Sequence, residues 1–387
     1  MPQTPPKPPS TPFATISPPA PPRRPPCFRS PLSLLFVLLL PLVLLPCSAM
    51  HPDAPPPPAF PPAPPAPQIL LLDHMNLNHR LGDHQSVLSF YVRTLALSLD
   101  SRKAPNIDAG EGTLWVNAGA TQLHLSGGRP EPQVLDGRVT FLYKSVPALS
   151  RLQSRAVRNE VSYTSYPPGL ASPVAPSRSL GGGGGAQPCM VLRCPYGNEV
   201  VARVGEADPR GSQPDTDPSM ECNGISEVEL FVPDASSLPG IARFYNAAFA
   251  ANCSVADGPG TALSPPGPRV RVAFGPTQHV TFRPGPQRNQ GYADGDGPHV
   301  SLYVGGLAEV WGNVQAIDPG LVYVNPRFKR QALTLADAEE QCMFRVLNIV
   351  DPLSPGKVLF RLEHEIRSPT NKDGTKYKSY PLGHAPP

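Results

Sequence analysis

The first ordered pattern of apolar and polar residues begins at Gln68. QILLLDHMNLNH is apolar and then alternating, which is typical of a β-strand with one face in a core. HQSVLSFYVRTLALSL places Val87, Tyr91 and Leu95 at helical spacing and ends in a short strand. GTLWVNAG and ATQLHLSGG are two more strands around a Gly-Ala turn. This stretch therefore predicts one βαβββ unit.

The same order of elements recurs along the rest of the chain with decaying sequence. The second copy reads GRVTFLYKS, VPALSRLQSRA and CMVLRCPYGNEVVARV, the third runs from GISEVELFVP to QHVTFRPG, and the fourth runs from HVSLYVGGLAEVWGNV through GLVYVNPRF to KVLFRLEHEIRS. We interpret this as an α+β fold of four βαβββ units in two pairs. The expected boundaries are a first domain at 68–206, a linker at 207–222, a second domain at 223–368 and a C-terminal tail at 369–387.

The chain before the first unit differs in composition, since it holds 25 of the 56 prolines. A basic stretch without acids precedes the apolar run LSLLFVLLLPLVLLP, and Cys47-Ser48-Ala49 follow it. This run is shorter than the roughly 20 residues of a membrane-spanning helix, and the order basic, apolar, small is that of a signal peptide. We predict a removed targeting leader at 1–49 and a disordered proline-rich spacer at 50–67. A retained membrane anchor is the alternative.

Arg23-Arg24, ahead of the apolar run, also permits a bipartite plastid address. The leader therefore predicts export or organelle import, with the secretory pathway and the plastid both left open. Removing it takes away four cations and no acid, which changes the formal charge from +3 to −1. A near-neutral remainder disfavours a dedicated nucleic-acid binder, which needs a basic face. We expect a small-molecule substrate or ligand, no nucleic acid, no nucleotide cofactor and no membrane contact after cleavage.

The four units resemble the vicinal oxygen chelate superfamily, which includes glyoxalase I, extradiol dioxygenases and fosfomycin-resistance proteins. The matching segments are LDHMNLN, FYVRTLALSLD and TQLHLSGG in the first half, and FYNAAFA, HVSLYV and FRLEHEIRS in the second. The resemblance implies that each pair of units closes an open barrel-like cavity around one small site. It further implies a divalent metal held by the first and last strands of each unit, which chelates two neighbouring oxygens of the substrate. Tandem units also allow a monomer in which the domains pair within one chain.

Strand alternation gives the first domain one polar wall, which a structural core would not require. The residues on this wall that we expect to bind a ligand are His74, Asn76, Trp115, Asn117 and His124. By register, His74 and His124 occupy the two ligand positions that the resemblance implies, whereas the second unit offers Arg138 and Val201 there. Two histidines alone make a poor metal site. The alternatives are therefore a metal site, a metal-free site in which Arg138 or Arg203 binds a carboxylate, and a degenerate cavity.

The second domain offers the more complete set of metal ligands. The resemblance places Glu227 and His299 at ligand positions, with His279 as an optional fourth if its strand slips by two positions from Thr281. In the last strand, alternation selects Glu363, whereas a strict count from the Gly356 turn would select Phe360. Glu227 stands where extradiol dioxygenases have histidine, which disfavours iron-based oxygen chemistry and favours the glyoxalase pattern. A solvated strand end at LEHEIRS is the plain alternative.

These residues lead to two main hypotheses of function. The first is a metal-dependent lyase or isomerase of the lactoylglutathione-lyase type, with Zn, Ni, Mn or Fe as the metal and a 2-oxoaldehyde-type substrate. Glu363 or Glu227 would be its catalytic base, removing a proton from a carbon beside a carbonyl. The second is a metal-free small-molecule-binding protein with degenerate metal sites, and an extradiol-type dioxygenase remains a further alternative.

Overall fold

The structure is a computed structural model that describes residues 68–110, 112–129, 132–166, 188–206, 208, 217, 219–258, 265–288, 297–328 and 331–375. The predicted leader and spacer, most of the predicted linker and the end of the predicted tail lie outside the described residues. In the described part of the chain, no helix has the length and apolar composition needed to cross a membrane.

The elements follow one another in four units. The first contains β1 (Ile69–Arg80), α1 (His84–Leu88), a π-helical turn (Ser89–Thr94), β2 (Ser98–Leu99), α2 (Pro105–Ala109), β3 (Thr113–Ala118) and β4 (Thr121–Arg129). The second contains β5 (Gly137–Tyr143), α3 (Val146–Arg158), β6 (Tyr163–Tyr166), β7 (Cys189–Arg193) and β8 (Glu199–Val204). The third contains β9 (Cys222–Val232), α4 (Leu238–Phe249), β10 (Val255–Gly258), β11 (Gly267–Ala273) and β12 (His279–Pro284).

The fourth unit departs from the pattern. It contains β13 (His299–Val304), α5 (Leu307–Ile317), α6 (Leu335–Gln341), β14 (Met343–Asp351) and β15 (Ser354–Arg367). GLVYVNPRF, which the pattern predicts to be a strand, begins in a 3-10 turn (Pro319–Leu321) and pairs only at the single bridge Val322–Val346. Pro326 lacks the N–H that a continuing ladder needs, and α6 follows in place of a second strand.

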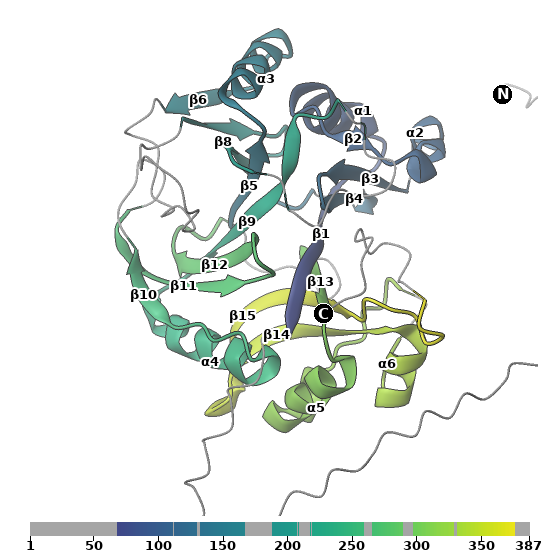
Figure 1. The fold of residues 1–387 in the computed structure, drawn as a ribbon, viewed down its shortest axis with the longest axis vertical. Helices are drawn as coiled ribbons and strands as arrows, with labels where there is room; N and C mark the ends of the chain where they lie inside the picture. The colour runs from purple at the N-terminus through teal and green to yellow at the C-terminus, as the bar shows by residue number, and fades with distance from the viewer. Residues whose placement is uncertain are drawn as a thin grey trace, which may run out of the picture. The chain divides into compact units, whose positions relative to one another are not determined.

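The strands form two mixed sheets, seen in Figure 1. The seven-stranded sheet has the order β14-β15-β13-β1-β4-β3-β2, and the eight-stranded sheet has the order β10-β11-β12-β9-β5-β8-β7-β6. The α+β class and the paired βαβββ units are therefore confirmed. The partners differ from the expected ones, however, because the first unit shares a sheet with the fourth and the second with the third. The domain boundaries themselves stay a prediction.

Two antiparallel contacts join the units within the sheets. β1 pairs with β13, which places Asn76 opposite His299, and β5 pairs with β9, which places Thr140 opposite Glu227. The sheets meet at Gln278, whose side chain accepts from Leu72 N at 3.1 Å and donates to Ile225 O at 3.1 Å. A buried amide thus satisfies backbone groups of both sheets.

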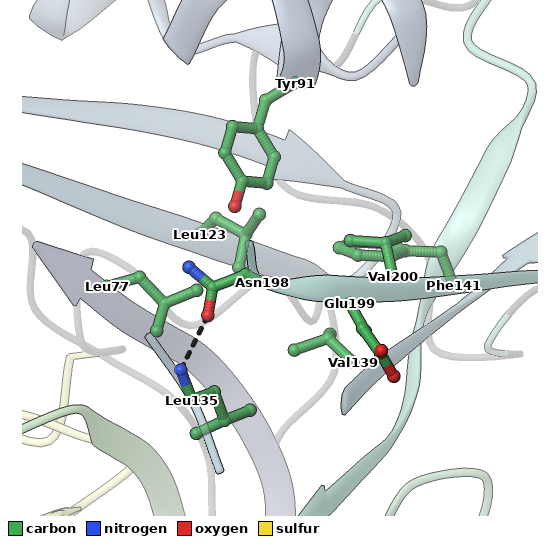
Figure 2. Close-up of a pocket in the computed structure, with 9 residues that line it drawn as sticks. All are labelled: Leu77, Tyr91, Leu123, Leu135, Val139, Phe141, Asn198, Glu199 and Val200. Atoms are coloured by element: carbon green, nitrogen blue, oxygen red, sulfur yellow. Dashed lines mark hydrogen bonds between the residues drawn. The ribbon is translucent and has the colours of Figure 1, made fainter. Parts of the chain in front are cut away.

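Alternation along the strands separates a core face from a polar face, as the sequence predicts. Met75 and Leu77 of β1 lie in the apolar core that the helices cover, whereas His74 and Asn76 point to the other side and are nonetheless buried. The core is tightly packed where β1 and β4 approach β5 and β8. The cavity between these strands has a volume of about 10 Å³, enough for one water. Asn198, at the edge of this cavity, accepts a hydrogen bond from Leu135 N at 2.7 Å (Figure 2). This cavity is too small for a substrate.

Candidate metal centre

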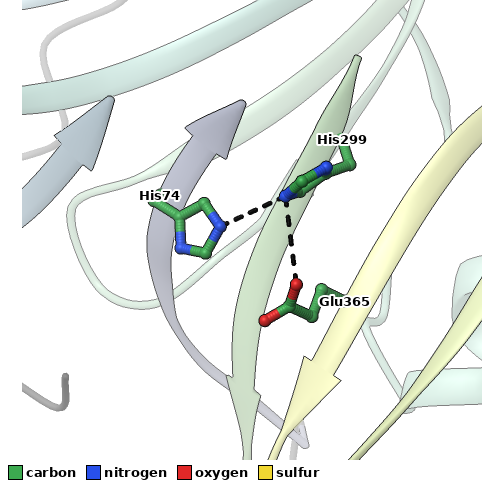
Figure 3. Close-up of side chains that lie close together, drawn as sticks. All are labelled: His74, His299 and Glu365. Atoms are coloured by element: carbon green, nitrogen blue, oxygen red, sulfur yellow. Dashed lines mark hydrogen bonds and ion pairs between the residues drawn. The ribbon is translucent and has the colours of Figure 1, made fainter. Parts of the chain in front are cut away.

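Three strands of the seven-stranded sheet bring His74, His299 and Glu365 together (Figure 3). One potential ligand atom from each residue lies within 4.8 Å of the other two. The Nε2 atoms of the two histidines are 3.3 Å apart, and His299 Nε2 is 3.9 Å from Glu365 Oε2. All three side chains are buried, with 1%, 5% and 4% of their surface exposed. The three groups therefore form one compact, water-poor cluster.

Asp73 fixes the orientation of the His74 ring. Its Oδ2 accepts from His74 Nδ1 at 2.9 Å and from Arg367 Nη1 at 2.9 Å. Because a carboxylate only accepts, the proton of the neutral ring lies on Nδ1, which leaves the lone pair of Nε2 directed at the cluster. This carboxylate–histidine arrangement is the usual support of a metal-binding histidine.

The electrostatics keep both histidines in the form that binds metals. Burial lowers the pKa of His74, although its hydrogen bond to Asp73 acts in the opposite direction. Burial, followed by the positive charge of Arg345, lowers the pKa of His299 well below its ordinary value. Both imidazoles are therefore neutral near pH 7, as metal coordination requires.

Glu365 stays ionised despite its burial. Desolvation acts to raise the pKa of its carboxyl, but the positive charges of Arg345 and then Arg367 outweigh it and hold the pKa well below the ordinary value. Arg345 donates to Oε2, and Arg367 donates to Oε1. Each carboxylate oxygen has two lone pairs, so Glu365 retains acceptor capacity for a metal. The two arginines also fix its position.

Glu363 lies on the same face of β15, two residues before Glu365. It accepts from Asn325 Nδ2 at 2.7 Å and from Arg345. Burial raises its pKa, and the opposing effects of Arg345 and Asn325 are smaller. Glu363, one of the predicted ligands, thus stands next to the cluster, and Glu365 is the carboxylate whose oxygen belongs to it.

His124 forms an aromatic wall beside the cluster. Its ring stacks on His74 with centroids 3.6 Å apart and on Trp115 at 4.7 Å, and its Nε2 is 3.1 Å from Gln122 Oε1. Burial and the neighbouring His74 lower its pKa well below the ordinary value. The predicted pair of His74 and His124 is therefore brought together by stacking, and His74 alone joins the three-residue cluster.

The other predicted ligand-binding residues are divided between the two sheets. Asn76 accepts from Ser126 Oγ at 2.8 Å, and Asn117 accepts from Gln122 Nε2 at 2.5 Å, both in the seven-stranded sheet near His124. Arg138 lies in the eight-stranded sheet, where its Nε is 3.3 Å from Glu199 and 3.5 Å from Glu229.

The four-residue metal set predicted from the sequence is likewise divided between the sheets. Glu227 and His279 are neighbours in the eight-stranded sheet, away from the strands of His299 and Glu363. Glu227 accepts from Thr281 Oγ1 at 2.6 Å, and His279 Nδ1 is 3.0 Å from Arg271 Nη2. Within the described residues, His74, His299 and Glu365 form the single group of three potential ligand atoms.

Sequence reasoning missed Asp73, Arg345, Arg367 and the part played by Glu365. Two of these had a local signal, since Asp73 directly precedes His74 and Glu365 shares its strand face with Glu363. The arginines had none, because a buried arginine that pairs with two acids resembles any other arginine in the sequence.

The donor set fits a divalent transition metal. Two histidines and one carboxylate are the ligands typical of non-haem iron sites, and the same groups bind Zn, Ni and Mn. Two nitrogen ligands at about 2.1 Å and near a right angle lie roughly 3 Å apart, close to the 3.3 Å between the two Nε2 atoms. Counting Asp73, Glu363 and Glu365 against Arg345 and Arg367, the cluster carries a net charge of −1 before any cation binds.

No family profile matches the sequence, and no curated protein matches it. Among solved structures, the chain is similar to glyoxalase I from Zea mays, with 13% identity over 77% of this chain and 92% of that one and a TM-score of 0.45. A proposed dioxygenase from Bacillus subtilis has 14% identity over 80% of this chain and 89% of that chain, with a TM-score of 0.45. Lactoylglutathione lyase from Agrobacterium tumefaciens has 15% identity over 39% of this chain and 96% of that chain, with a TM-score of 0.24. The paired βαβββ architecture follows from the strand order of the two sheets, independently of these neighbours.

Proposed function

We propose that this protein is a metal-dependent enzyme of the vicinal oxygen chelate type, with one divalent ion held by His74, His299 and Glu365. The observation that carries the proposal is the convergence of these three ligand atoms within 4.8 Å. When bound, the ion would polarise two neighbouring oxygens of a small substrate. Both halves of the site come from one chain, which supports a monomer.

The residues around the cluster have separate tasks. Asp73 holds His74 in the tautomer that presents Nε2. Arg345 and Arg367 fix Glu365 and balance its charge. Glu363, whose pKa is raised by burial, is placed to accept a proton from a carbon beside a carbonyl, because a base is most effective when its pKa approaches the working pH. These roles support a lyase or isomerase reaction on a 2-oxoaldehyde-type substrate.

An extradiol-type dioxygenase is the second candidate, and one observation favours it. The donor set of two histidines and a carboxylate is that of many iron-dependent oxygenases. In the sequence analysis, iron was disfavoured because Glu227 stands at a ligand position where extradiol dioxygenases have histidine. His74 shares the sheet of His299 and Glu365 whereas Glu227 lies in the other sheet, so that objection no longer applies. Oxygen consumption with a catechol would distinguish this reaction from isomerisation of a 2-oxoaldehyde adduct.

Metal content tests the proposal directly. We would measure it by elemental mass spectrometry on the full chain, purified after growth with added Zn, Ni, Mn and Fe. About one equivalent in the wild type, lost in His299→Ala and retained in His279→Ala, is the expected result. His279 is the matched control, since it lies in the other sheet. A wild-type protein without metal would overturn the proposal and leave a metal-free binding protein.

A further inference from the structure

The eight-stranded sheet also has a charged face, on the side away from the core. Alternate positions of β5, β7, β8, β9, β11 and β12 place six arginines and three glutamates on it: Arg138, Arg193, Arg203, Arg269, Arg271, Arg283, Glu199, Glu227 and Glu229. Their sequence neighbours, such as Val139, Val200 and Val228, lie in the apolar core. The face therefore carries a positive excess in a chain of nearly neutral composition.

Most of these charges are paired. Glu199 is 3.3 Å from Arg138 and 3.0 Å from Arg193, and Glu229 binds Arg283 at 2.6 Å. Arg203 and Arg271 differ from them, because neither forms an ion pair with a carboxylate of the described residues. Their contacts are with neutral groups: Arg203 Nη2 donates to Ser226 Oγ at 3.3 Å, and Arg271 Nη2 donates to His279 Nδ1 at 3.0 Å.

These contacts bring the two guanidinium groups to neighbouring strands. Ser226 precedes Glu227 on β9, and Glu227 is the direct neighbour of His279 on β12. The Nε atoms of both arginines are buried and have no hydrogen-bond partner. Glu227 is the nearest acid, and its Oε1 already accepts from Thr281. Arg203 and Arg271 thus lie near the same carboxylate, Glu227, and neither forms an ion pair with it.

The charge balance here is opposite to that of the metal centre. Arg203, Arg271 and Glu227 leave a net charge of +1, whereas the cluster around Glu365 has −1. Burial lowers the pKa of Arg203, Glu227 acts in the opposite direction, and Arg271 lowers it further. The pKa of His279 falls to about 3 through burial, Arg271 and Arg203. Such a site repels a divalent cation and attracts an anion.

Space for a ligand lies along the same face. A cavity of about 360 Å³ is lined by residues of β5 to β8, among them Arg138, Tyr163 and Tyr166. Tyr166 is the strand neighbour of Cys189, which in turn is the strand neighbour of Arg203. Arg203 therefore lies two strands from Tyr166 at the edge of this cavity, and neither Arg203 nor Arg271 lines it. This volume is in the range of small-molecule sites.

We propose that Arg203 and Arg271 form a second ligand site, which binds the carboxylate or phosphate group of a small anionic molecule. Guanidinium groups match the geometry of these oxyanions, with paired N–H donors. Bound there, the anion would take up the two unpartnered Nε donors and relieve the repulsion between the arginines. The site is separate from the metal centre and does not depend on it.

Calorimetric titration of the full chain tests this site, with succinate and inorganic phosphate as probes and the ionic strength held constant. We expect saturable binding of at least one probe, weakened tenfold or more in Arg203→Gln and in Arg271→Gln. Arg158→Gln, an exposed arginine of α3, is the control for net charge and should bind as the wild type does. Binding of succinate alone would assign a carboxylate ligand, and binding of phosphate alone a phosphate ester.

A second measurement needs no variant. Phenylglyoxal modifies accessible arginines, and peptide mass spectrometry reports the rate at each one. The bound probe should slow modification of Arg203 and Arg271 at least fivefold and leave Arg158 unchanged. Absence of saturable binding of both probes, or equal binding by the wild type and both glutamine variants, would overturn the proposal. Metal content should be the same in Arg203→Gln as in the wild type, which separates this result from the fate of the metal centre.

Discussion

The Nε2 atoms of His74 and His299 lie 3.3 Å apart, although 225 residues separate the two histidines in the chain. They meet because β1 and β13 are antiparallel neighbours, with Asn76 opposite His299. The site therefore exists only when the first and fourth units share a sheet. The two middle units build the other sheet, and their own charged residues form a cluster of different chemistry.

Glu363 and Glu365 should separate metal binding from catalysis. Glu365→Ala removes a ligand, so we expect metal occupancy below a tenth of the wild-type value. Glu363→Ala removes a buried carboxylate that is held by Arg345 and Asn325 and is not one of the three clustered ligand atoms, so it should keep most of the metal and lose turnover 100-fold or more. Metal analysis and steady-state kinetics on both variants check this. Equal metal loss in the two variants would make Glu363 a ligand as well.

Asp73 should contribute to metal affinity without touching the ion. Asp73→Asn keeps the size of the side chain but weakens its hold on the Nδ1 proton of His74, and loss of such a partner typically costs 10- to 100-fold in affinity. Competition with a chromogenic chelator measures the change. Asp351→Asn, which alters the surface pair of Asp351 with Arg243, is the control and should leave affinity unchanged. An Asp73→Asn protein with wild-type affinity would remove this role.

Arg345 should be the most costly arginine of the site to replace. It is buried, binds both Glu363 and Glu365, and lies 4.1 Å from the centre of the Phe328 ring. Arg345→Met leaves two buried carboxylates without this partner, which should lower the free energy of unfolding by about 3–5 kcal/mol. Urea denaturation of the apoprotein measures it.

The surface pair of Arg243 and Asp351 is the matched comparison for Arg345. Arg243 is 42% exposed, so Arg243→Met should cost at most about 1 kcal/mol. If Arg345→Met cost no more than Arg243→Met, the buried network would contribute little to stability.

The sequence predicts which side chains of a single strand face the core. It does not predict which two of the four units pair to form a sheet. The faces of β1 and β4 follow from the two-residue period, and His74, Asn76 and His124 lie on the polar side as predicted. The four units share one strand pattern, so no local signal states which two form a sheet. For this reason the sequence placed His74 and His299 in different cavities.

The choice between Glu363 and Glu365 exposes a second limit. Both lie on the same face of β15, so the two-residue period cannot distinguish them. Their roles are set by Arg345, Arg367 and Asn325, which reach them from β14, the end of β15 and a loop. These are tertiary contacts, and the electrostatic environment that they create is absent from any pattern along one strand.

His279 should make the protein sensitive to mild acid. Burial, Arg271 and Arg203 lower its pKa to about 3 in the folded chain, against about 6.5 when unfolded. A depressed histidine pKa means that the folded state binds fewer protons. Its contribution to stability is therefore complete above pH 6.5 and is lost as the pH falls toward 3.

Urea denaturation at several pH values measures this contribution. Between pH 7 and pH 5 the wild type should lose up to about 2 kcal/mol more stability than His279→Gln, because glutamine does not titrate. Other buried histidines contribute to the acid sensitivity of both proteins, and the difference between the two curves isolates His279. Parallel curves over this range would show that His279 is protonated as easily in the folded chain as in the unfolded one, in spite of the two arginines beside it.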